Sequence, residues 1–204
     1  MSKMKTAPSI IEDTLFAEGM SPVAGVDEVG RGPLAGPVMT CALILPPGLI
    51  INGVNDSKKV TEKRREKLAD EIKEAAISYA FGIAEPAEID RINILQAAMQ
   101  AMAAAVEALK ITPAVVLADG ITRPPCACKV ICVPKGDSAS HLIAAASILA
   151  KVERDNIMKE LHKEYPHFGW DKNKGYGTKA HMAALREYGL SPVHRKSFCK
   201  GFII

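Results

Sequence analysis

The sequence has few aromatic residues and no long apolar run, and these two shortages exclude several classes of protein. Phe, Trp and Tyr make up only 5% of the chain, while Ala, Ile, Leu and Val dominate its apolar share. Because such side chains suit helices packed on a sheet better than an all-β sandwich, we predict an α/β fold. A membrane-spanning helix needs about 18 apolar residues, and no run approaches that length. The opening "MSKMKTAPSIIEDTL" has acids where a signal peptide has its apolar centre, so we expect a cytoplasmic protein with no membrane partner.

Net charge and cysteine content do not identify a partner either. The 26 basic and 23 acidic residues leave a net charge of only +3, so local clusters of charge would have to recognise a nucleic acid. Five cysteines, an odd number, fit a reducing compartment. Cys126, Cys128 and Cys132 crowd together, but their C-x-C-x3-C spacing lacks the paired C-x2-C of structural zinc sites. Packing at strand edges explains these thiols better than zinc does.

Periodicity predicts five strands and four helices. Short apolar runs predict strands at residues 23–28, 36–45, 78–84, 113–120 and 128–134. Apolar residues at helical spacing predict helices at 61–77, 94–110, 138–164 and 178–188. Thr61 is a predicted N-cap, and "EPAEIDRIN" (85–93) is predicted to form a turn opened by proline.

The chain is long enough for one full domain with an appendage, but not for two full domains. We divide its 204 residues into an N-terminal extension (1–21), a main domain (22–164) and a C-terminal helical lobe (165–204). The lobe is richer in basic residues and glycine, and Pro166 separates it from the preceding helix because proline ends a helix.

Four acids follow apolar runs at the predicted ends of strands. Asp27 and Glu28 follow the first strand, Asp119 closes "VVLAD", and Asp137 follows "VPKG". Each has an ordinary alternative explanation: an ion pair with Arg31 for the first two, an Asp-Gly turn for the third, and helix capping for the fourth. Together they describe an oxygen-lined site for Mg²⁺ or Mn²⁺ at the strand ends, where α/β folds usually bind ligands. Two such ions about 4 Å apart promote phosphodiester hydrolysis.

Glycine-rich segments supply further candidates. Gly30 and Gly32 flank Arg31 in a turn that is too short for a dinucleotide fingerprint and precedes a strand. One explanation is that the two glycines serve only to form a tight turn. The alternative is that they let the backbone approach a sugar closely while the guanidinium of Arg31 offers a charged fork. Tyr176, between two glycines, suits stacking on a sugar or base. Packing on Trp170 is an equally good explanation.

Basic residues gather in three segments: "NDSKKVTEKRR", "DKNKGYGTK" and "HRKSF". Lys63, Arg64 and Arg65 share the outer face of a predicted helix, which is typical of solvated charge. By contrast, a loop is predicted to present hydroxyl and ammonium groups that bind phosphate well, those of Ser57, Lys58 and Lys59.

Several segments occur in an order that resembles bacterial ribonuclease HII, the type 2 ribonuclease H family. They are "AGVDEVGRGPLAGPV", "NDSKK", "AEPAEIDRINIL", "KGDS", "AASILAKVERD", "NKGYGT" and "HRKSF", and they span about residues 22 to 198. The ordered series is far more specific than any one of its members. The resemblance implies a ribonuclease H-like fold, with a central five-stranded mixed sheet flanked by helices and a small C-terminal helical lobe that binds substrate.

The resemblance also implies roles for single residues. The metal-binding, catalytic acids of the family fall on Asp27, Glu28, Asp119 and Asp137, which would hold two divalent ions, Mn²⁺ or Mg²⁺. Gly30, Arg31 and Gly32 match the element that reads the ribonucleotide 2′-hydroxyl, and Tyr176 matches the tyrosine that stacks on the sugar at the RNA-to-DNA junction. The other matching segments add predicted substrate contacts at Ser57, Lys58, Lys59, Arg195 and Ser197.

This chain departs from the family pattern at two positions. Gly177 stands where proline is common, and Ile121 stands where asparagine is common. A more flexible tyrosine loop is expected to loosen the junction preference, whereas no metal ligand is lost. Asp155 also lies in a matching segment, and we predict a structural role for it because it lies deep within a long helix.

The activity that the resemblance implies is hydrolysis on the 5′ side of ribonucleotides in RNA/DNA hybrids and in duplex DNA with embedded ribonucleotides. The products would carry 3′-hydroxyl and 5′-phosphate ends, and the setting would be ribonucleotide repair and RNA primer removal. Two alternatives stay open: a DNA-directed nuclease on the same scaffold, and a noncatalytic module that binds hybrids. We expect a monomer, and the terminal "KGFII" lacks the glutamine of a clamp-binding peptide.

Overall fold

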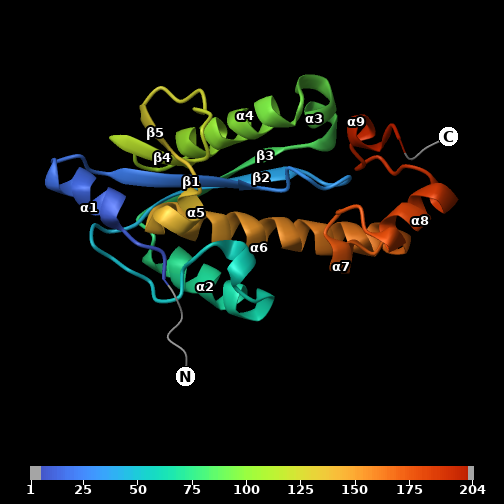
Figure 1. Ribbon diagram of the computed structural model, residues 1–204, viewed down its shortest axis with the longest axis horizontal. Coiled ribbons are helices and arrows are strands. Elements are labelled where there is room, and N and C mark those ends of the chain that lie inside the picture. Colours follow the sequence, from blue (N-terminus) through green and yellow to red (C-terminus); the bar gives the residue numbers. More distant parts are fainter. Residues whose placement is uncertain (1–5, 202–204) are drawn as a thin grey trace.

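A mixed five-stranded sheet forms the centre of the protein (Figure 1). The computed structural model describes residues 6–201. The strands lie in the order β3-β2-β1-β4-β5, with β2 antiparallel to both β1 and β3, and β1, β4 and β5 parallel. Their bounds are β1 Val23–Val29, β2 Val38–Ile44, β3 Ser78–Ala84, β4 Val115–Asp119 and β5 Lys129–Val133. The predicted α/β fold and mixed sheet are confirmed.

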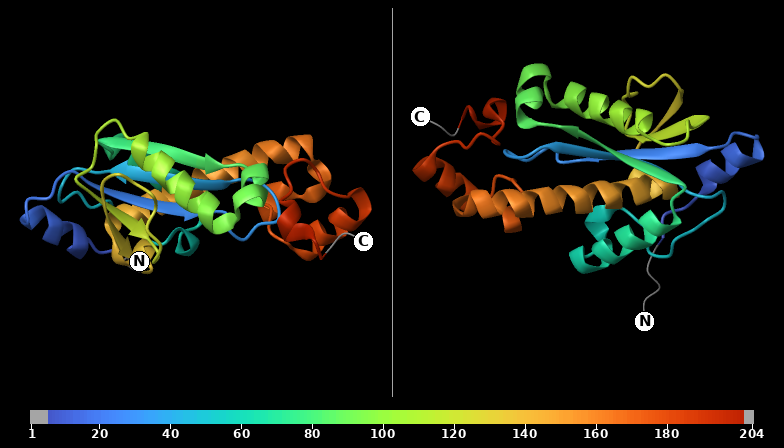
Figure 2. Two further views of the ribbon diagram at one scale, coloured as in Figure 1. Left: turned by 90° about the horizontal axis from the view of Figure 1, so that it is seen from above. Right: turned by 180° about the vertical axis from the view of Figure 1, so that it is seen from behind.

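Helices cover both faces of this sheet, which explains why its central strands are apolar on both sides. One face carries α3 (Pro86–Ile92) and α4 (Ile94–Glu107), and the other carries α2 (Glu62–Ala75) and α6 (His141–Glu164) (Figures 1 and 2). Two glycines allow close approach. A Cβ on Gly25 would come 2.5 Å from the backbone of Leu142 on α6, and one on Gly82 would come 2.0 Å from the Ala101 carbonyl on α4.

The two faces receive alternate side chains of β1. Ala24 and Val26 join the core under α4, whereas Val23 joins the core under α6. Because successive residues of a strand point to opposite faces, Asp27 points toward α6 and Glu28 toward α4. The adjacent acids therefore approach the same strand end from opposite sides of the sheet.

The N-terminal extension packs against the main domain from residue 6 onward. It contains α1 (Ile10–Ala17), and Leu15 belongs to the core under α6. Glu12 is buried, and its Oε1 accepts hydrogen bonds from Ser140 Oγ at 2.6 Å and from the Leu142 N–H at 2.9 Å. This extension thus binds the start of α6.

The C-terminal lobe lies beyond one end of the sheet, opposite α1 (Figure 2). It contains η2 (Pro166–Phe168), α7 (Trp170–Asn173), α8 (Lys179–Tyr188) and α9 (Lys196–Cys199). Its core also takes in Leu34 and Ala35 from the loop after β1, and Met158 from α6. The lobe is therefore built around residues of the main domain.

The structure corrects two local predictions. Within residues 85–93, Pro86–Ile92 form the helix α3 instead of a turn, because Pro86 occupies a first-turn position where its missing N–H costs nothing. Asn93, with φ of 71°, then separates α3 from α4 and caps α4 through its side chain. The helix predicted at 138–164 is interrupted: α5 spans Gly136–Ala139, and extended backbone at Ser140 separates it from α6.

The other predicted helices are confirmed with small changes at their ends. Thr61 occupies the predicted N-cap of α2, but its side chain makes no capping hydrogen bond. The basic "NDSKK" segment forms a short 3₁₀ helix, η1 (Ser57–Lys59). In the part of the chain from residue 6 to 201, no helix is long and apolar enough to cross a membrane.

Candidate active site

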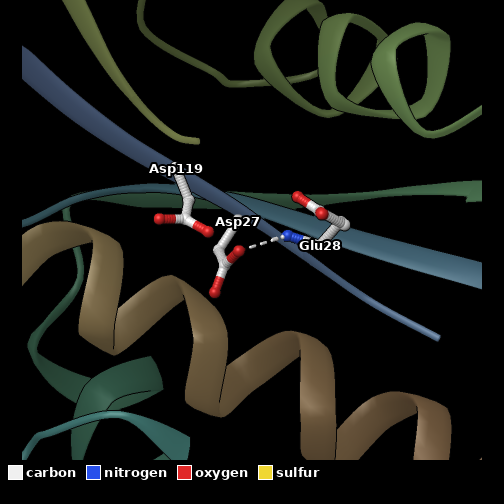
Figure 3. A group of neighbouring side chains, drawn as sticks. All are labelled: Asp27, Glu28 and Asp119. Atoms are coloured by element: carbon white, nitrogen blue, oxygen red, sulfur yellow. Dashed lines mark hydrogen bonds between the residues drawn. The ribbon is translucent and has the colours of Figure 1, made fainter. Parts of the chain in front are cut away.

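Three acids meet at the carboxyl ends of β1 and β4 (Figure 3). The two strands are parallel, and their register pairs Val26 with Ala118. Because the next residues are Asp27 and Asp119, the register brings these side chains together. Glu28 follows on β1, and one oxygen from each of the three carboxylates lies within 4.8 Å of the others. Sheet formation therefore unites acids that are far apart in the chain.

The three carboxylates repel one another where water has little access. Asp27 is 4% exposed, and burial, followed by the charges of Glu28 and Asp119, raises its pKa well above the usual range. Burial also raises the pKa of Glu28, although Arg31 opposes that shift. The Glu28 N–H donates to Asp27 Oδ1 at 2.7 Å, which offsets only part of the free-energy cost of burying the charged Asp27 carboxylate. A divalent cation fits this set, because Mg²⁺ and Mn²⁺ prefer oxygen donors with negative charge.

Asp137 lies at the edge of this group. It belongs to α5, whose Gly136 N–H donates to Asp119 Oδ1 at 2.6 Å. Burial, and then the charges of Asp56 and Asp119, raise the pKa of Asp137. Helix capping does not explain Asp137, because Ser140 caps the long helix. The structure thus brings three of the four predicted ligands together and holds the fourth beside them.

The glycine-rich loop after β1 is fixed by two buried arginines. Gly30 has a φ of +96°, and a Cβ on it would come 2.2 Å from Arg154 Nε, so only glycine fits there. The guanidinium of Arg195 donates to the carbonyls of Gly30 at 2.6 Å, Arg31 at 3.1 Å and Gly36 at 2.8 Å. The loop is therefore held by its backbone, which leaves the Arg31 side chain free for other partners.

Arg31 and Tyr176 reach the surface beside the acids and the loop. The Arg31 guanidinium lies 3.3 Å from Glu28 Oε1 and is about half exposed, at 49%. The predicted ion pair with Arg31 is therefore formed by Glu28, and the guanidinium still has exposed surface. Tyr176 is 44% exposed, and a Cβ on Gly32 would lie 3.6 Å from its ring. Trp170 packs on Phe168 instead, with centroids 5.0 Å apart.

Comparison with known proteins decides which family has this arrangement. The family model described as ribonuclease HII matches residues 24–201. The chain belongs to the ribonuclease HII family. The ribonuclease HII of Desulfitobacterium hafniense (strain DSM 10664 / DCB-2) is 54% identical over 187 residues, which cover 92% of this chain and 72% of that protein. The ribonuclease HII of Chlamydia abortus is 53% identical over 194 residues, with 93% and 90% covered.

Solved structures agree with this membership. Ribonuclease H2 from Pyrococcus horikoshii OT3 aligns with a TM-score of 0.71 and 29% identity, covering 86% of this chain and 92% of that one. Ribonuclease HII from Archaeoglobus fulgidus, solved in complex with PCNA, aligns with a TM-score of 0.73 and 25% identity, covering 88% and 94%. The protein is a ribonuclease H, an endonuclease that acts on nucleic acid and depends on divalent metal.

A cleft of about 440 Å³ opens beside the acids of this ribonuclease HII. Its walls combine charge, from the acids and two cations, with apolar side chains. It is lined by Glu28, Arg31, Leu95, Met99, Asp119, Gly120, Ile121, Thr122, Pro134 and Lys135. Ile121, the residue that departs from the family pattern, is 83% exposed at this cleft.

Lys58 and Lys59 lie beside α5, next to Asp137 and Ser138. Their side chains are 83% and 59% exposed. Lys58 Nζ lies 4.0 Å from Asp137 Oδ2, and Lys59 Nζ donates to Ser138 Oγ at 3.1 Å. Both ammonium groups are therefore accessible to a phosphate that approaches α5.

Two predicted substrate contacts are corrected because their polar groups point into the protein. Ser57 is buried, and its hydroxyl pairs with Ser147 Oγ at 2.9 Å. Arg195 is fully buried, and its hydrogen bonds are those that hold the glycine-rich loop. Ser197 is exposed, but its N–H donates to Asp90 Oδ1 at 2.9 Å and its hydroxyl donates to the same atom.

Sequence reasoning missed Arg154, which joins the glycine-rich loop to the tyrosine segment. It is completely buried and donates to the carbonyls of Pro37 at 2.9 Å, Ala35 at 3.2 Å and Lys174 at 2.9 Å. A signal was present, because Arg154 follows Ala150 by four residues on the apolar face of its helix. Its neighbour Asp155 has the predicted structural role, with an ion pair to Lys151 at 2.6 Å.

Proposed function

We propose that the strand-end acids are the catalytic centre with which this ribonuclease HII cuts on the 5′ side of ribonucleotides. The substrates are RNA/DNA hybrids and DNA duplexes with embedded ribonucleotides, and the products carry 3′-hydroxyl and 5′-phosphate ends. The observation that supports this proposal most directly is the convergence of three carboxylates within 4.8 Å at one edge of the sheet. Such a site is unfavourable without cations and is suited to a reaction that uses them.

Asp27, Glu28 and Asp119 would hold the metal, and Asp137 would complete the set from α5. When bound, two divalent ions supply a polarised water and stabilise the charge of the leaving 3′-oxygen. The chain's own contribution is to keep these carboxylates close and poorly hydrated, as the raised pKa values of Asp27, Glu28 and Asp137 indicate. Mg²⁺ and Mn²⁺ are both candidates, since either accepts an all-oxygen set.

The glycine-rich loop and Tyr176 would supply the choice of RNA over DNA. The 2′-hydroxyl both donates and accepts hydrogen bonds and distinguishes the two sugars. Gly32 is exposed and presents accessible backbone beside Arg31, and the half-exposed ring of Tyr176 lies next to it. Gly30 is buried, and its carbonyl accepts from Arg195, so its part would be to set the course of the loop. Lys58 and Lys59 would bind backbone phosphates with little regard to sequence.

We further infer that the protein acts as a cytoplasmic monomer, in ribonucleotide repair and RNA primer removal. Residues 22–164 would form the catalytic domain and 165–204 the substrate-binding lobe, with residues 1–21 as an extension. The Archaeoglobus fulgidus relative was solved with PCNA, whereas the "KGFII" end of this chain lies partly outside the described residues.

A DNA duplex with one embedded ribonucleotide tests the proposal directly. We expect one cut on the 5′ side of that ribonucleotide when Mn²⁺ or Mg²⁺ is present, and intact duplex when EDTA is added. The matched all-DNA duplex should stay intact. Equal cutting of both duplexes would favour a DNA-directed nuclease, and metal-dependent binding without cutting would favour a noncatalytic module.

A further inference from the structure

A buried polar network fills the C-terminal lobe behind Tyr176, and the cleavage reaction makes no direct use of it. Trp170 and His181 are fully buried, and His194 is 2% exposed. Their rings pack together with Phe168. Two histidines in such a place need partners for every ring nitrogen, because an unpaired polar atom there is costly.

The hydrogen bonds of the network can have only one direction. The backbone N–H of Ser191 donates to His194 Nδ1 at 2.9 Å, so the proton of neutral His194 is on Nε2. That atom lies 3.0 Å from His181 Nε2, which must therefore accept. The indole Nε1 of Trp170 can only donate, and it donates to the same His181 Nε2 at 3.2 Å. Two independent donors thus assign His181 Nε2 as an acceptor.

The network ends on the backbone of Tyr176. With Nε2 as acceptor, the proton of neutral His181 is on Nδ1, which lies 3.0 Å from the Tyr176 carbonyl oxygen. The Thr178 N–H donates to the same oxygen at 2.8 Å. Burial lowers the pKa of both histidines, to about 4 for His194, which agrees with neutral rings.

We propose that His181 is a positioning residue, which fixes the Tyr176 carbonyl and so aims the exposed ring at the junction sugar. The inference rests on the proposed stacking role of Tyr176 and adds what holds that ring in place. His181 has no access to substrate, so its effect must pass through Tyr176.

The sequence around Tyr176 explains why such an anchor is needed. Glycines precede and follow it, and Gly175 has a φ of +85°, so the local backbone has little stiffness of its own. Lys174 is also left-handed, with a φ of 51°. If the ring were disordered in the free protein, ordering it on binding would cost conformational entropy and weaken the affinity for substrate. The buried network supplies the rigidity that a proline at position 177 would otherwise add.

A double-mutant cycle tests the proposal. We expect His181→Leu, which removes all three hydrogen bonds of the His181 ring, to lower kcat/KM for a single embedded ribonucleotide by roughly tenfold, the size of a lost stacking contact. In a Tyr176→Ala background the same change should cost less than about twofold. His181→Asn, whose amide can take the place of Nδ1–H, should restore part of the activity. His162→Leu, which changes a partly buried histidine of α6 outside this network, is the control.

Hydrogen exchange in the free protein separates this inference from the proposed function. His181→Leu should speed exchange of the Thr178 amide, which shares the Tyr176 carbonyl, while His162→Leu should not. Unchanged exchange at Thr178 would overturn the positioning role, as would an equal loss of kcat/KM in both backgrounds. If Tyr176→Ala cleaves as well as the wild type, the stacking role fails, and the exchange data still decide whether His181 fixes the loop.

Discussion

The strand ends and the C-terminal lobe bury ionisable groups in opposite ways. Asp27, Glu28 and Asp119 gather like charges, so burial and mutual repulsion raise the pKa of Asp27 well above its usual range. In the lobe, His181 and His194 are buried as neutral rings whose nitrogens have partners, and burial lowers their pKa values. The acid site is incomplete without a cation, whereas the histidine network is complete by itself.

This difference matches what each region has to do. A site that binds metal needs unfavourable charge that a cation relieves, because the relief adds to the binding free energy. A region that positions a substrate-binding ring needs satisfied hydrogen bonds, because these resist movement. The two buried arginines, Arg154 and Arg195, connect the regions by holding the loop that lies between them.

Loss of one strand-end acid should have the largest effect. We expect Asp119→Asn to reduce cleavage roughly a thousandfold, because several kcal/mol of charge stabilisation depend on correct metal placement. Folding and hybrid binding should be retained. Single-turnover cleavage and a binding titration measure the two effects, with Asp70→Asn on the exposed face of α2 as the control. Cleavage within a few-fold of wild type would remove Asp119 from the catalytic set.

Metal-free stability should report the charge repulsion directly. The folded-state pKa of Asp27 is raised, so its carboxylate destabilises the fold as the pH rises above the ordinary value of 3.8. Asp27→Asn should therefore raise the melting temperature of the metal-free protein at pH 7 by a few degrees. It should also reduce the further rise that Mn²⁺ gives to the wild type. A lower melting temperature in EDTA would contradict the repulsion.

The lobe should respond to pH with the opposite sign. The pKa of His194 is lowered from 6.5 to about 4, so the unfolded chain binds a proton first and stability falls as the pH drops through that window. His194→Asn should be less stable than wild type at pH 7, and the gap in melting temperature should narrow between pH 6.5 and 4. A constant difference in melting temperature from pH 6.5 to 4 would show that protonation of His194 does not cause the pH dependence of stability.

Substitution of two surface cations, Arg31 and Lys58, should have smaller effects. Arg31→Ala should reduce the preference for RNA over DNA by roughly tenfold, since a hydrogen bond to a charged group is lost. Lys58→Ala should leave that preference intact and lower the salt dependence of binding by about one unit of slope. Binding titrations with RNA-containing and all-DNA duplexes at about 50 to 200 mM salt measure the preference and the salt dependence. Identical behaviour of the two variants would contradict the proposal that Arg31 discriminates between sugars while Lys58 binds phosphate.

The acids were predictable only as a set, because all four follow apolar runs and parallel strands end at the same edge of a sheet. The helical spacing of apolar residues also located most helices. It failed at 85–93, where Pro86 opened a helix instead of a turn, and at Ser140, where an extended residue divides α5 from α6. Both errors concern backbone geometry at helix starts, which short-range composition specifies weakly.

The sequence did not show which way the polar side chains of Ser57 and Arg195 point. Ser57 and Arg195 carry hydrogen-bond donors that suit phosphate, yet both side chains point inward. Arg154 was not recognised as a structural residue. An arginine bound to carbonyls and one bound to phosphate look the same in a sequence, because the donors are identical and only the packing differs.

Residue order along short segments was enough to predict the fold class, the positions of the strand-end acids and the family. The tertiary structure alone decided that three acids converge while Asp137 stays at their edge, and that the histidines of the lobe lie behind Tyr176. The physical reason is that charge repulsion and hydrogen-bond direction depend on distances of a few ångströms between distant segments, and only folding sets those distances.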